Sequence, residues 1–172
     1  MSNIRLINAS CVDQEVDAIV NAANKYLYSG GGICGEIFRR NGIDLEEACS
    51  KINTPLNDGE AVITPSFNMP NTKYIIHAVG PNFNITPNSF KELFNAYYNS
   101  LLVLKNNNLH TIAFPLISSG IYGGKLDNPA KISANSCKQA YDKFIKEYKD
   151  YNIEVLLCAY TKKEMQDIGE FI

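Results

Sequence analysis

The sequence predicts an α/β fold, a three-layer α/β/α sandwich with a central mixed β-sheet. Short segments rich in β-branched and aromatic residues alternate with longer segments whose apolar residues recur at helical spacing. Strands that alternate with helices in this way are typical of a sheet enclosed by two helical layers. The chain has 172 residues, which is the size of one domain with its own apolar core, so we expect residues 1–172 to form a single domain.

The first half of the chain contains four expected strands and two expected helices. The strands are predicted from their β-branched and aromatic content, and the helices from polar segments with spaced apolar residues. The expected strands cover residues 4–7, 18–20, 61–67 and 74–79. The first helix should open near Gly35 and run to Gly42, and the second should cover residues 45–52.

The second half continues the alternation with three helices and two strands. Ser89 and Glu92 have the spacing of a capping box, and the apolar residues over 90–102 fall at helical spacing. Residues 111–117 form an apolar run typical of a buried central strand. Pro129 suits the first turn of the next helix. Residues 154–159 read as the last strand, and Thr161 and Glu164 form a second capping-box pattern that opens a final helix.

The composition limits the classes of function. Apolar residues make up 45% of the chain and charged residues 20%, as in ordinary globular domains, and the net charge of −2 argues against a nucleic acid as main partner. The five cysteines include no C-x-x-C pair and there are only two histidines, so we expect no metal site. The sequence shows no signal peptide and no membrane-spanning run. We expect a monomer in the reducing cytoplasm that contacts no membrane.

Two glycine-bearing loops are the most informative feature of the chain. The first follows the expected strand that ends at Val20 and contains Gly30, Gly31 and Gly32, and the second covers residues 118–124 after the strand that ends at Ile117. Glycines let backbone N–H groups approach an anion, and a helix that starts after such a loop adds free donors. If both strands run in the same direction, both loops lie beyond their carboxyl ends, where ligands of such sheets bind. The pair predicts a site for a diphosphate.

Two common phosphate motifs fit these loops poorly. Residues 30–35 match G-x-G-x-x-G, but nine residues separate Val20 from Gly30 and a polar helical segment follows where a dinucleotide fold needs its second strand. Gly123-Gly124-Lys125 lacks the Ser or Thr and the upstream glycine of a P-loop. Neither a Rossmann dehydrogenase nor an ATPase is favoured.

Several polar residues have two interpretations. Asn21 and Asn24 either cap a turn after their strand or hold ribose hydroxyls, and the two interpretations stay open. His77 lies in an apolar strand, which favours a hydrogen-bonded core histidine over a catalytic one. Cys34 lies near a helix start, where a thiol pKa falls, but no His or acid is close in sequence, so a space-filling role is favoured over a nucleophile. The pairs Arg39-Arg40 and Lys162-Lys163 are interpreted as solvated.

The ordered motifs of the chain resemble those of the macrodomain family, and of its MacroD-like branch most. The chain has VDAIVNAAN over 16–24, three glycines over 30–32, GEA over 59–61, YIIHAVGP over 74–81 and SGIYG over 119–123. The resemblance covers nearly the whole chain. It implies a three-layer α/β/α fold that binds ADP-ribose and often hydrolyses mono-ADP-ribose from acidic side chains. The family also includes O-acetyl-ADP-ribose deacetylases and pure binders.

The resemblance also implies a role for each part of the site. The loop over 31–34 would hold the distal ribose and one phosphate, residues 118–122 would close over the diphosphate, Asn24 would bond the distal ribose, and Tyr160 would flank the adenine. Asn21 and Ala22 would line the same wall as Asn24. The implied ligand-binding residues are Ser10, Cys11, Asn21, Ala22, Asn24, Gly31, Gly32, Ile33, Cys34, Ser118, Ser119, Gly120, Ile121, Tyr122 and Tyr160.

Three positions depart from the family pattern. Ser10, followed by Cys11, stands where an Asp usually accepts from the adenine amino group, and Cys34 and Phe38 stand where the MacroD-like branch has an Asp and a His. Because some active branches carry a small residue in place of that Asp, its absence does not exclude turnover, but it removes the usual general base.

The function expected from the resemblance is hydrolysis of mono-ADP-ribose from acidic side chains, with ADP-ribose or a mono-ADP-ribosylated protein as partner. Asn24 is the expected catalytic residue, a water placed by the substrate phosphate attacks, and neither a metal nor a cofactor is needed. A non-catalytic reader of ADP-ribose is the first alternative, which Cys34 and Phe38 favour. An O-acetyl-ADP-ribose deacetylase is the second.

Overall fold

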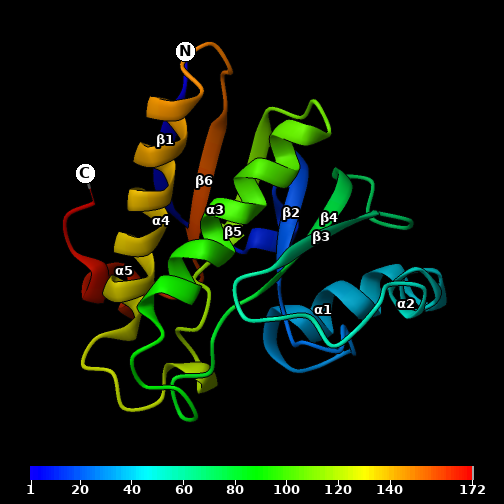
Figure 1. The fold of residues 1–172 in the computed structure, drawn as a ribbon, viewed down its shortest axis with the longest axis horizontal. Helices are drawn as coiled ribbons and strands as arrows, with labels where there is room; N and C mark the ends of the chain where they lie inside the picture. Colours follow the sequence, from blue (N-terminus) through cyan, green and yellow to red (C-terminus); the bar gives the residue numbers. More distant parts are fainter. Residues whose placement is uncertain (172) are drawn as a thin grey trace.

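The computed structural model describes residues 1–171, and its centre is a six-stranded β-sheet (Figure 1). The strand order across the sheet is β1-β6-β5-β2-β4-β3. Neighbouring strands are parallel except β3 and β4, which are antiparallel, so the expected mixed sheet is confirmed. The strands are β1 (Asn3–Asn8), β2 (Val16–Ala23), β3 (Ala61–Pro65), β4 (Thr72–Val79), β5 (Thr111–Pro115) and β6 (Glu154–Ala159).

Helices cover both faces of the sheet, which gives the three layers that the sequence predicts. The short 3-10 helix η1 and helices α1 and α2 share one apolar cluster with sheet residues such as Ile19 and Ile75. Helices α3 and α4 share the other cluster with Phe114 and Val155, and α5 packs beside α4 (Figure 1). The helices are η1 (Cys11–Asp13), α1 (Gly32–Asn41), α2 (Ile43–Ser50), α3 (Phe90–Asn106), η2 (Ile121–Gly123), α4 (Pro129–Glu147) and α5 (Lys162–Ile168).

The starts of α1 and α2 and the cap of α3 differ from the sequence prediction, and the cap of α5 agrees with it; α2, expected over 45–52, covers Ile43–Ser50. Helix α1 begins at Gly32 and not near Gly35, because Gly31 takes the N-cap position and glycine lowers helix propensity without forbidding a first turn. The capping box at Ser89 is wrong: its hydroxyl donates to the carbonyl of Thr86 and accepts no bond from the helix. The capping box between Thr161 and Glu164 is confirmed at the start of α5.

Strand ends differ by two residues at two places where the chain turns. The strand expected over 61–67 ends at Pro65, and the one expected over 111–117 ends at Pro115. Both ends carry a proline, which has no N–H for the ladder. As a result Leu116 and Ile117 belong to the second glycine loop and connect it to the core.

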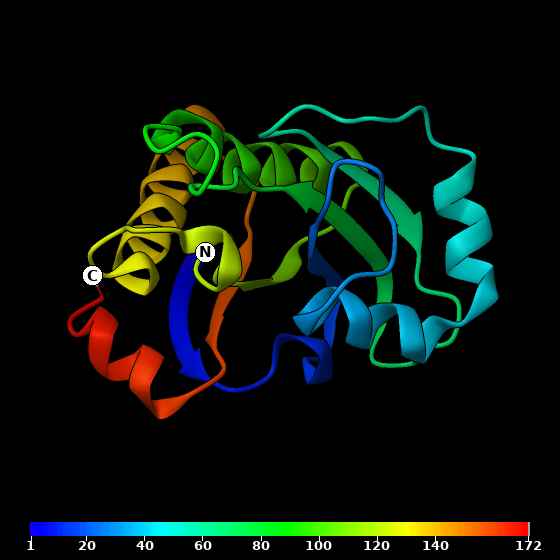
Figure 2. The same ribbon diagram turned by 90° about the horizontal axis from the view of Figure 1, so that it is seen from below.

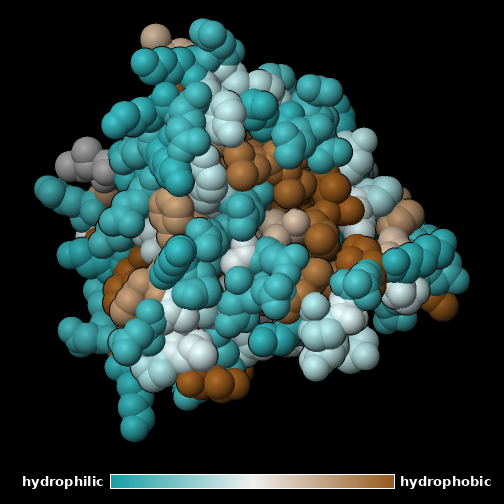
Figure 3. Space-filling model, in the orientation of Figure 1, coloured by the Kyte–Doolittle hydropathy of each residue, from teal (hydrophilic) through white to brown (hydrophobic). Residues whose placement is uncertain are grey.

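The surface that Figure 3 shows is mostly polar, with apolar side chains gathered between α3 and the edge strand β3. Ala61 and Ile63 of β3 and Leu102 of α3 are only partly covered there. Within residues 1–171, no helix is both long and apolar enough to cross a membrane. All five cysteines are buried and unpaired.

Candidate functional site

The two glycine loops lie side by side at one edge of the sheet. Strands β2 and β5 are adjacent and parallel, with Ala18 beside Ile112 and Ile19 beside Ala113. Their carboxyl ends therefore meet at the same edge, as the sequence analysis expected. Figure 2 looks onto this edge and shows the blue loop that follows β2 and, to its left, the yellow-green loop that follows β5.

The first loop supplies free backbone donors at the start of α1. Gly31 is the N-cap and no side chain caps the helix, so the N–H groups of Gly32, Ile33 and Cys34 have no intrahelical partner. The loop also packs tightly, since a Cβ on Gly35 would overlap the carbonyl oxygen of Gly30. These donors and the positive end of the helix dipole suit an anion.

The second loop is held by the end of β4. The Ser118 hydroxyl donates to the carbonyl of Pro81 over 2.7 Å, and Ser118 itself has a positive φ of 60°. Gly80 allows this approach, because a Cβ there would overlap Ile117 Cγ2 and Ser118 Oγ. Within residues 1–171 no acceptor receives the backbone N–H groups over 120–122, so this loop also offers free donors.

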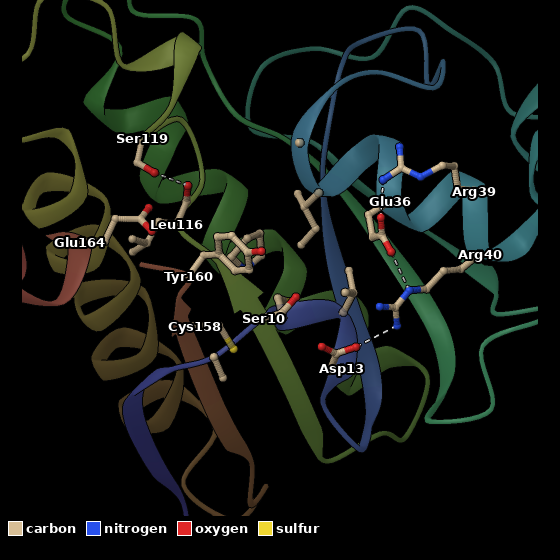
Figure 4. A pocket seen from close by; sticks show the side chains of 16 residues that line it. Ser10, Asp13, Glu36, Arg39, Arg40, Leu116, Ser119, Cys158, Tyr160 and Glu164 are labelled. Atoms are coloured by element: carbon tan, nitrogen blue, oxygen red, sulfur yellow. Dashed lines mark hydrogen bonds and ion pairs between the residues drawn. The ribbon is translucent and has the colours of Figure 1, made fainter. Parts of the chain in front are cut away.

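A cavity of about 530 Å³ lies between the two loops, η1 and the end of β6 (Figure 4). Its lining includes free backbone donors, apolar side chains, two thiols and one exposed tyrosine ring. The lining residues are Ala9, Ser10, Cys11, Val12, Asp13, Gly32, Ile33, Glu36, Arg39, Arg40, Pro115, Leu116, Ser119, Cys158, Tyr160 and Glu164. The apolar lining and the ring suit a flat base, and the loop donors suit the phosphates attached to it.

Among the described residues, the Ser10 hydroxyl has no hydrogen-bond partner, and Ser10 lines this cavity. Ser10 is the N-cap of η1 but makes no capping bond through its side chain, and its carbonyl accepts from Gln14. The adjacent Cys11 is buried and lies against Cys158, and burial together with that neighbouring thiol raises its pKa well above the usual value. Tyr160, which directly follows β6, is exposed (Figure 4). Ser10 thus offers this cavity an uncharged hydroxyl.

Charged side chains of α1 line the rim of the same cavity, where Arg39 and Arg40 are exposed to solvent as the sequence analysis expected. Arg40 contacts both Glu36 and Asp13 at 2.9 Å, and Arg39 contacts Glu36. Figure 4 shows these side chains extending along the cavity wall. Because the two guanidinium groups are matched by two carboxylates, the rim carries little net charge.

A second cavity of about 200 Å³ lies on the other side of the loops. Asn24 and Tyr122 line it, so each glycine loop borders both cavities. Its other lining residues come from the turn after Asn24, from residue 58, from the end of β4 and from the segment between β4 and α3. The lining residues are Asn24, Lys25, Asp58, Val79, Gly80, Asn82, Ile85, Thr86 and Tyr122.

Asn24 orders the first loop through its own side chain. Its Oδ1 accepts from the N–H groups of Tyr26 and Tyr28, and its Nδ2 donates to the carbonyl of Tyr28 over 2.8 Å. These bonds are the turn cap that the sequence analysis left open. A side-chain amide has two N–H donors, so one N–H of Asn24 is still available to a ligand.

Asn21 lines neither cavity. It is fully buried, and its Nδ2 faces His77 Nδ1 at 3.1 Å, while His77 Nε2 faces Thr64 Oγ1 at 2.9 Å. Burial lowers the pKa of His77 to about 4, so its ring is neutral at neutral pH. His77 is thus the hydrogen-bonded core residue that the sequence favoured. Among the described residues, Asn21 Oδ1 is a buried side-chain oxygen without a partner.

Cys34 is buried below the first loop, with its thiol 3.5 Å from the carbonyl of Tyr28. Burial raises its pKa, which bonds from the Gly30 backbone and the Asn21 side chain only partly offset. The thiol therefore stays protonated at neutral pH, which fits the space-filling role and not a nucleophile.

The structure divides the predicted ligand residues into three groups. Ser10, Cys11, Gly32, Ile33, Ser119 and Tyr160 line the large cavity. Asn24 and Tyr122 line the small one. Asn21, Ala22, Gly31, Cys34, Ser118, Gly120 and Ile121 line neither, and direct contact of these residues with a ligand stays a prediction.

Sequence reasoning missed the lining residues that come from helix faces and from the end of β4. Glu36 was not considered, and Arg39 and Arg40 were interpreted as solvated without a place at a cavity, because periodicity alone does not show which turn of a helix borders one. The residues after β4 had a signal: Gly80 and Pro81 end a strand adjacent to β2, so their loop had to lie at the same sheet edge.

Comparison with known proteins gives consistent results. The Macro domain family matches residues 20–133. The ADP-ribose glycohydrolase MACROD2 of Xenopus laevis is 38% identical over 154 residues, which are 88% of this chain but 35% of that protein, so the chain spans about a third of that relative. An Oceanobacillus iheyensis macrodomain with ADP aligns with a TM-score of 0.86 and 30% identity over 97% of this chain and 88% of the other. A Trypanosoma brucei macrodomain in complex with ADP-ribose aligns with a TM-score of 0.80 and 28% identity over 96% and 67%.

Proposed function

Since the chain belongs to the Macro domain family, we propose that it binds ADP-ribose and hydrolyses mono-ADP-ribose from modified acidic side chains. The observation that carries the proposal is the pair of cavities joined by two loops with free N–H groups. The large cavity fits the adenosine, the loops bind the diphosphate, and the distal ribose ends beside Asn24. The similarity to MACROD2, which is named as an ADP-ribose glycohydrolase, and to a macrodomain solved with ADP-ribose supports the same assignment.

The residues of the chain act by positioning. The free N–H groups at the start of α1 and in the second loop hold the diphosphate, and the remaining N–H of Asn24 holds a hydroxyl of the distal ribose. A water bound by the substrate phosphate then attacks the anomeric carbon. The bond from that carbon to the ester oxygen breaks, its electron pair leaves on the side-chain carboxylate, and the proton lost by the water passes to the phosphate and on to solvent.

Two alternatives are separated by one experiment. A pure reader is favoured by Cys34 and Phe38, since neither can act as a base and both are buried. A deacetylase would act on O-acetyl-ADP-ribose in the same site. Wild-type protein is incubated with protein mono-ADP-ribosylated on acidic residues, and in parallel with O-acetyl-ADP-ribose, and the released nucleotide is identified by mass spectrometry. Release of ADP-ribose from the protein supports the proposal, whereas calorimetric binding without release from either substrate favours the reader.

A substitution in the first loop tests whether this loop holds the diphosphate. Gly31→Glu adds a carboxylate at the first loop, where φ is ordinary and no atom lies within 4 Å of the new Cβ. Calorimetry should show roughly 100-fold weaker ADP-ribose binding, as expected for a charge placed against a diphosphate. Thermal melting should be unchanged. Wild-type affinity in this variant would contradict the assignment of the loop.

Ser10 gives a prediction for the base end. Because its hydroxyl is free and lines the large cavity, Ser10→Asp should supply a charged acceptor to the adenine amino group. A charge-assisted hydrogen bond adds about 1.4 kcal/mol, so ADP-ribose should bind roughly tenfold more tightly in calorimetry. If Ser10→Asp bound ADP-ribose as the wild type does, or more weakly, the adenine base would not lie beside Ser10. Ser2→Asp, at the other end of β1, is the control.

A further inference from the structure

The two edge strands of the sheet differ in charge. β1 and β3 end the strand order, so each pairs with another strand on one side only. β1 carries Arg5, whose guanidinium lies 3.6 Å from Glu154 on the neighbouring strand β6. β3 carries no charged residue, and none follows it before Lys73. Charged side chains on an edge strand commonly keep it from pairing with another chain, so β3 is the edge that is open to a partner.

The register of β3 with β4 shows which backbone groups point outward. The two strands pair antiparallel, and directly after β3 the N–H of Ser66 donates to the carbonyl of Lys73 in the same register. Bonded and non-bonded pairs alternate in such a ladder, so the even-numbered residues of β3 bond β4. Ala61 and Ile63 therefore turn their N–H and C=O groups outward, and among the described residues these groups have no partner. Pro65 has no N–H, so the open ladder ends before it.

An apolar surface lies beside this edge on the α3 side of the sheet. Asn99 Nδ2 donates to the carbonyl of Gly59 over 2.8 Å, which sets one side of α3 against the start of β3. Leu102 lies nearly one turn further along that side, and α3 and β3 run in the same general direction (Figure 1). Leu102, Ala61 and Ile63 are only partly covered, and Figure 3 shows apolar side chains gathered there. The open ladder and the apolar surface are thus continuous.

We propose that this edge pairs with the same edge of a second copy of the chain, so that two sheets join into one across a two-fold axis. The strands run antiparallel with Val62 on the axis, and Ala61 of each copy lies opposite Ile63 of the other. Each copy brings two outward N–H groups and two outward carbonyls, and this register bonds all of them. On the α3 side, the large Ile63 lies beside the small Ala61 of the other copy, and Leu102 adds apolar contact.

A second copy fits this edge better than an unrelated strand for two reasons. The donors and acceptors of the edge match their own order when one copy is rotated by half a turn, so the interface needs no other sequence. The edge also has no charge, so it does not select a partner of opposite charge. Because one patch serves both copies and β1 keeps its Arg5, the assembly closes at two. The inference is independent of the proposed function and replaces the monomer expected from the sequence.

Sedimentation equilibrium tests the assembly state of the full chain. Between about 10 μM and about 1 mM, the range of weak interfaces, the average mass should rise from that of the monomer toward twice that value. A constant monomer mass over this range would overturn the proposal. A mass that rises beyond twice the monomer value would also overturn it, because a two-fold interface closes at two copies.

Two substitutions test whether β3 forms the interface. Ile63→Lys should keep the protein monomeric over the whole range, because it places a charge at the edge. Ile4→Lys is the matched control: Ile4 is a partly covered isoleucine of the other edge strand that packs on the same apolar cluster, and its variant should dimerise as the wild type does. Ala61→Pro removes an outward N–H but no bond to β4, and should weaken the dimer about tenfold. Melting curves check that each variant is folded, and a folded Ile63→Lys that still dimerises would contradict the proposal.

Amide hydrogen exchange followed by NMR tests the pairing in the wild type. The N–H groups of Ala61 and Ile63 should exchange at least about tenfold more slowly at high than at low protein concentration, because they are bonded only in the dimer. The N–H of Leu6, which β1 turns away from β6, should exchange at one rate throughout. If the protein dimerises while Ala61 and Ile63 keep one rate, the interface lies elsewhere and the proposal is wrong.

Discussion

The two glycine loops are supported in different ways from below. The first loop rests on polar side chains: Asn21 and His77 form a buried chain to Thr64 under α1 and α2, and Asn24 caps its own turn. The second loop rests on close packing and on one tyrosine. Tyr97 Oη accepts from Ile117 N–H over 3.0 Å and bonds Ser133 Oγ, which donates to the carbonyl of Ile117.

The two kinds of support have the same result: in both loops some backbone N–H groups stay free for a ligand. In each loop, side chains from a helix layer or from neighbouring strands bind some of the backbone polar groups, whereas the N–H groups over 32–34 and 120–122 have no acceptor among the described residues. In the first loop this support contains a titratable group, whereas in the second it does not change charge in the ordinary pH range. Changes to the supports should therefore separate the two loops.

The largest expected effect comes from acid and concerns the first loop. The pKa of His77 is about 4 in the folded chain and 6.5 when exposed, so between these values the unfolded state binds the extra proton. Stability is lost as the pH falls from 6.5 to 4, by about 3 kcal/mol at 1.36 kcal/mol per pKa unit. Urea unfolding at pH 7 and pH 4 should show this loss in the wild type.

The same measurement on His77→Gln isolates the contribution of the histidine. The variant lacks the titrating ring, so its pH dependence should be smaller than that of the wild type by about the same 3 kcal/mol. Equal slopes in the two proteins would mean that His77 is not buried as a neutral ring.

The second expected effect concerns the packing of the other loop. Gly80→Ala places a Cβ against Ile117 and Ser118, and overpacking of this kind costs about 2–3 kcal/mol of unfolding free energy. The second loop must move, so ADP-ribose binding should weaken as well. Gly120→Ala, which meets no atom within 4 Å, is the control for stability. A normal melting curve for Gly80→Ala would show that the loop is not packed as described.

Tyr97→Phe should have a smaller effect on the same loop. The change leaves the buried N–H of Ile117 without its acceptor, which costs about 1–2 kcal/mol in urea unfolding. Unlike the loss at His77, this loss should be the same at pH 4 and pH 7. A pH-dependent difference would contradict the distinction between the two supports. Tyr148→Phe, at the end of α4, serves as the matched control.

The smallest expected effect is at Cys34. Because its thiol is buried and its pKa is raised, Cys34→Ala should keep hydrolysis within about threefold of the wild type. Asn24→Ala, measured beside it, should lose most activity. If Cys34→Ala binds ADP-ribose normally but is inactive, a thiol mechanism replaces the water mechanism.

Much of the fold could be predicted from the sequence, because local patterns of apolar, glycine and proline residues determine where helices and strands form. The strand predicted over 154–159 and the helix start predicted at Pro129 are both confirmed. Both predictions rest on the spacing of apolar residues or on a proline, and these act over a few residues. The failed capping box at Ser89 shows the limit of such patterns. The Ser89 hydroxyl bonds the carbonyl of Thr86 and does not cap the helix. Which of these two bonds forms depends on the path of the preceding loop.

The sequence by itself determined that two glycine loops follow two strands, whereas the placement of Ser10, Asn24 and Tyr160 near one ligand comes from the family resemblance and stays a prediction. Only the tertiary structure decided that the site consists of two cavities, with Asn24 and Lys25 in the small one and Arg39 and Arg40 at the rim of the large one. The physical reason is that spacing along the chain fixes which residues share an element. The packing of α1 on η1, and of the second loop on Gly80, fixes which faces meet across a gap.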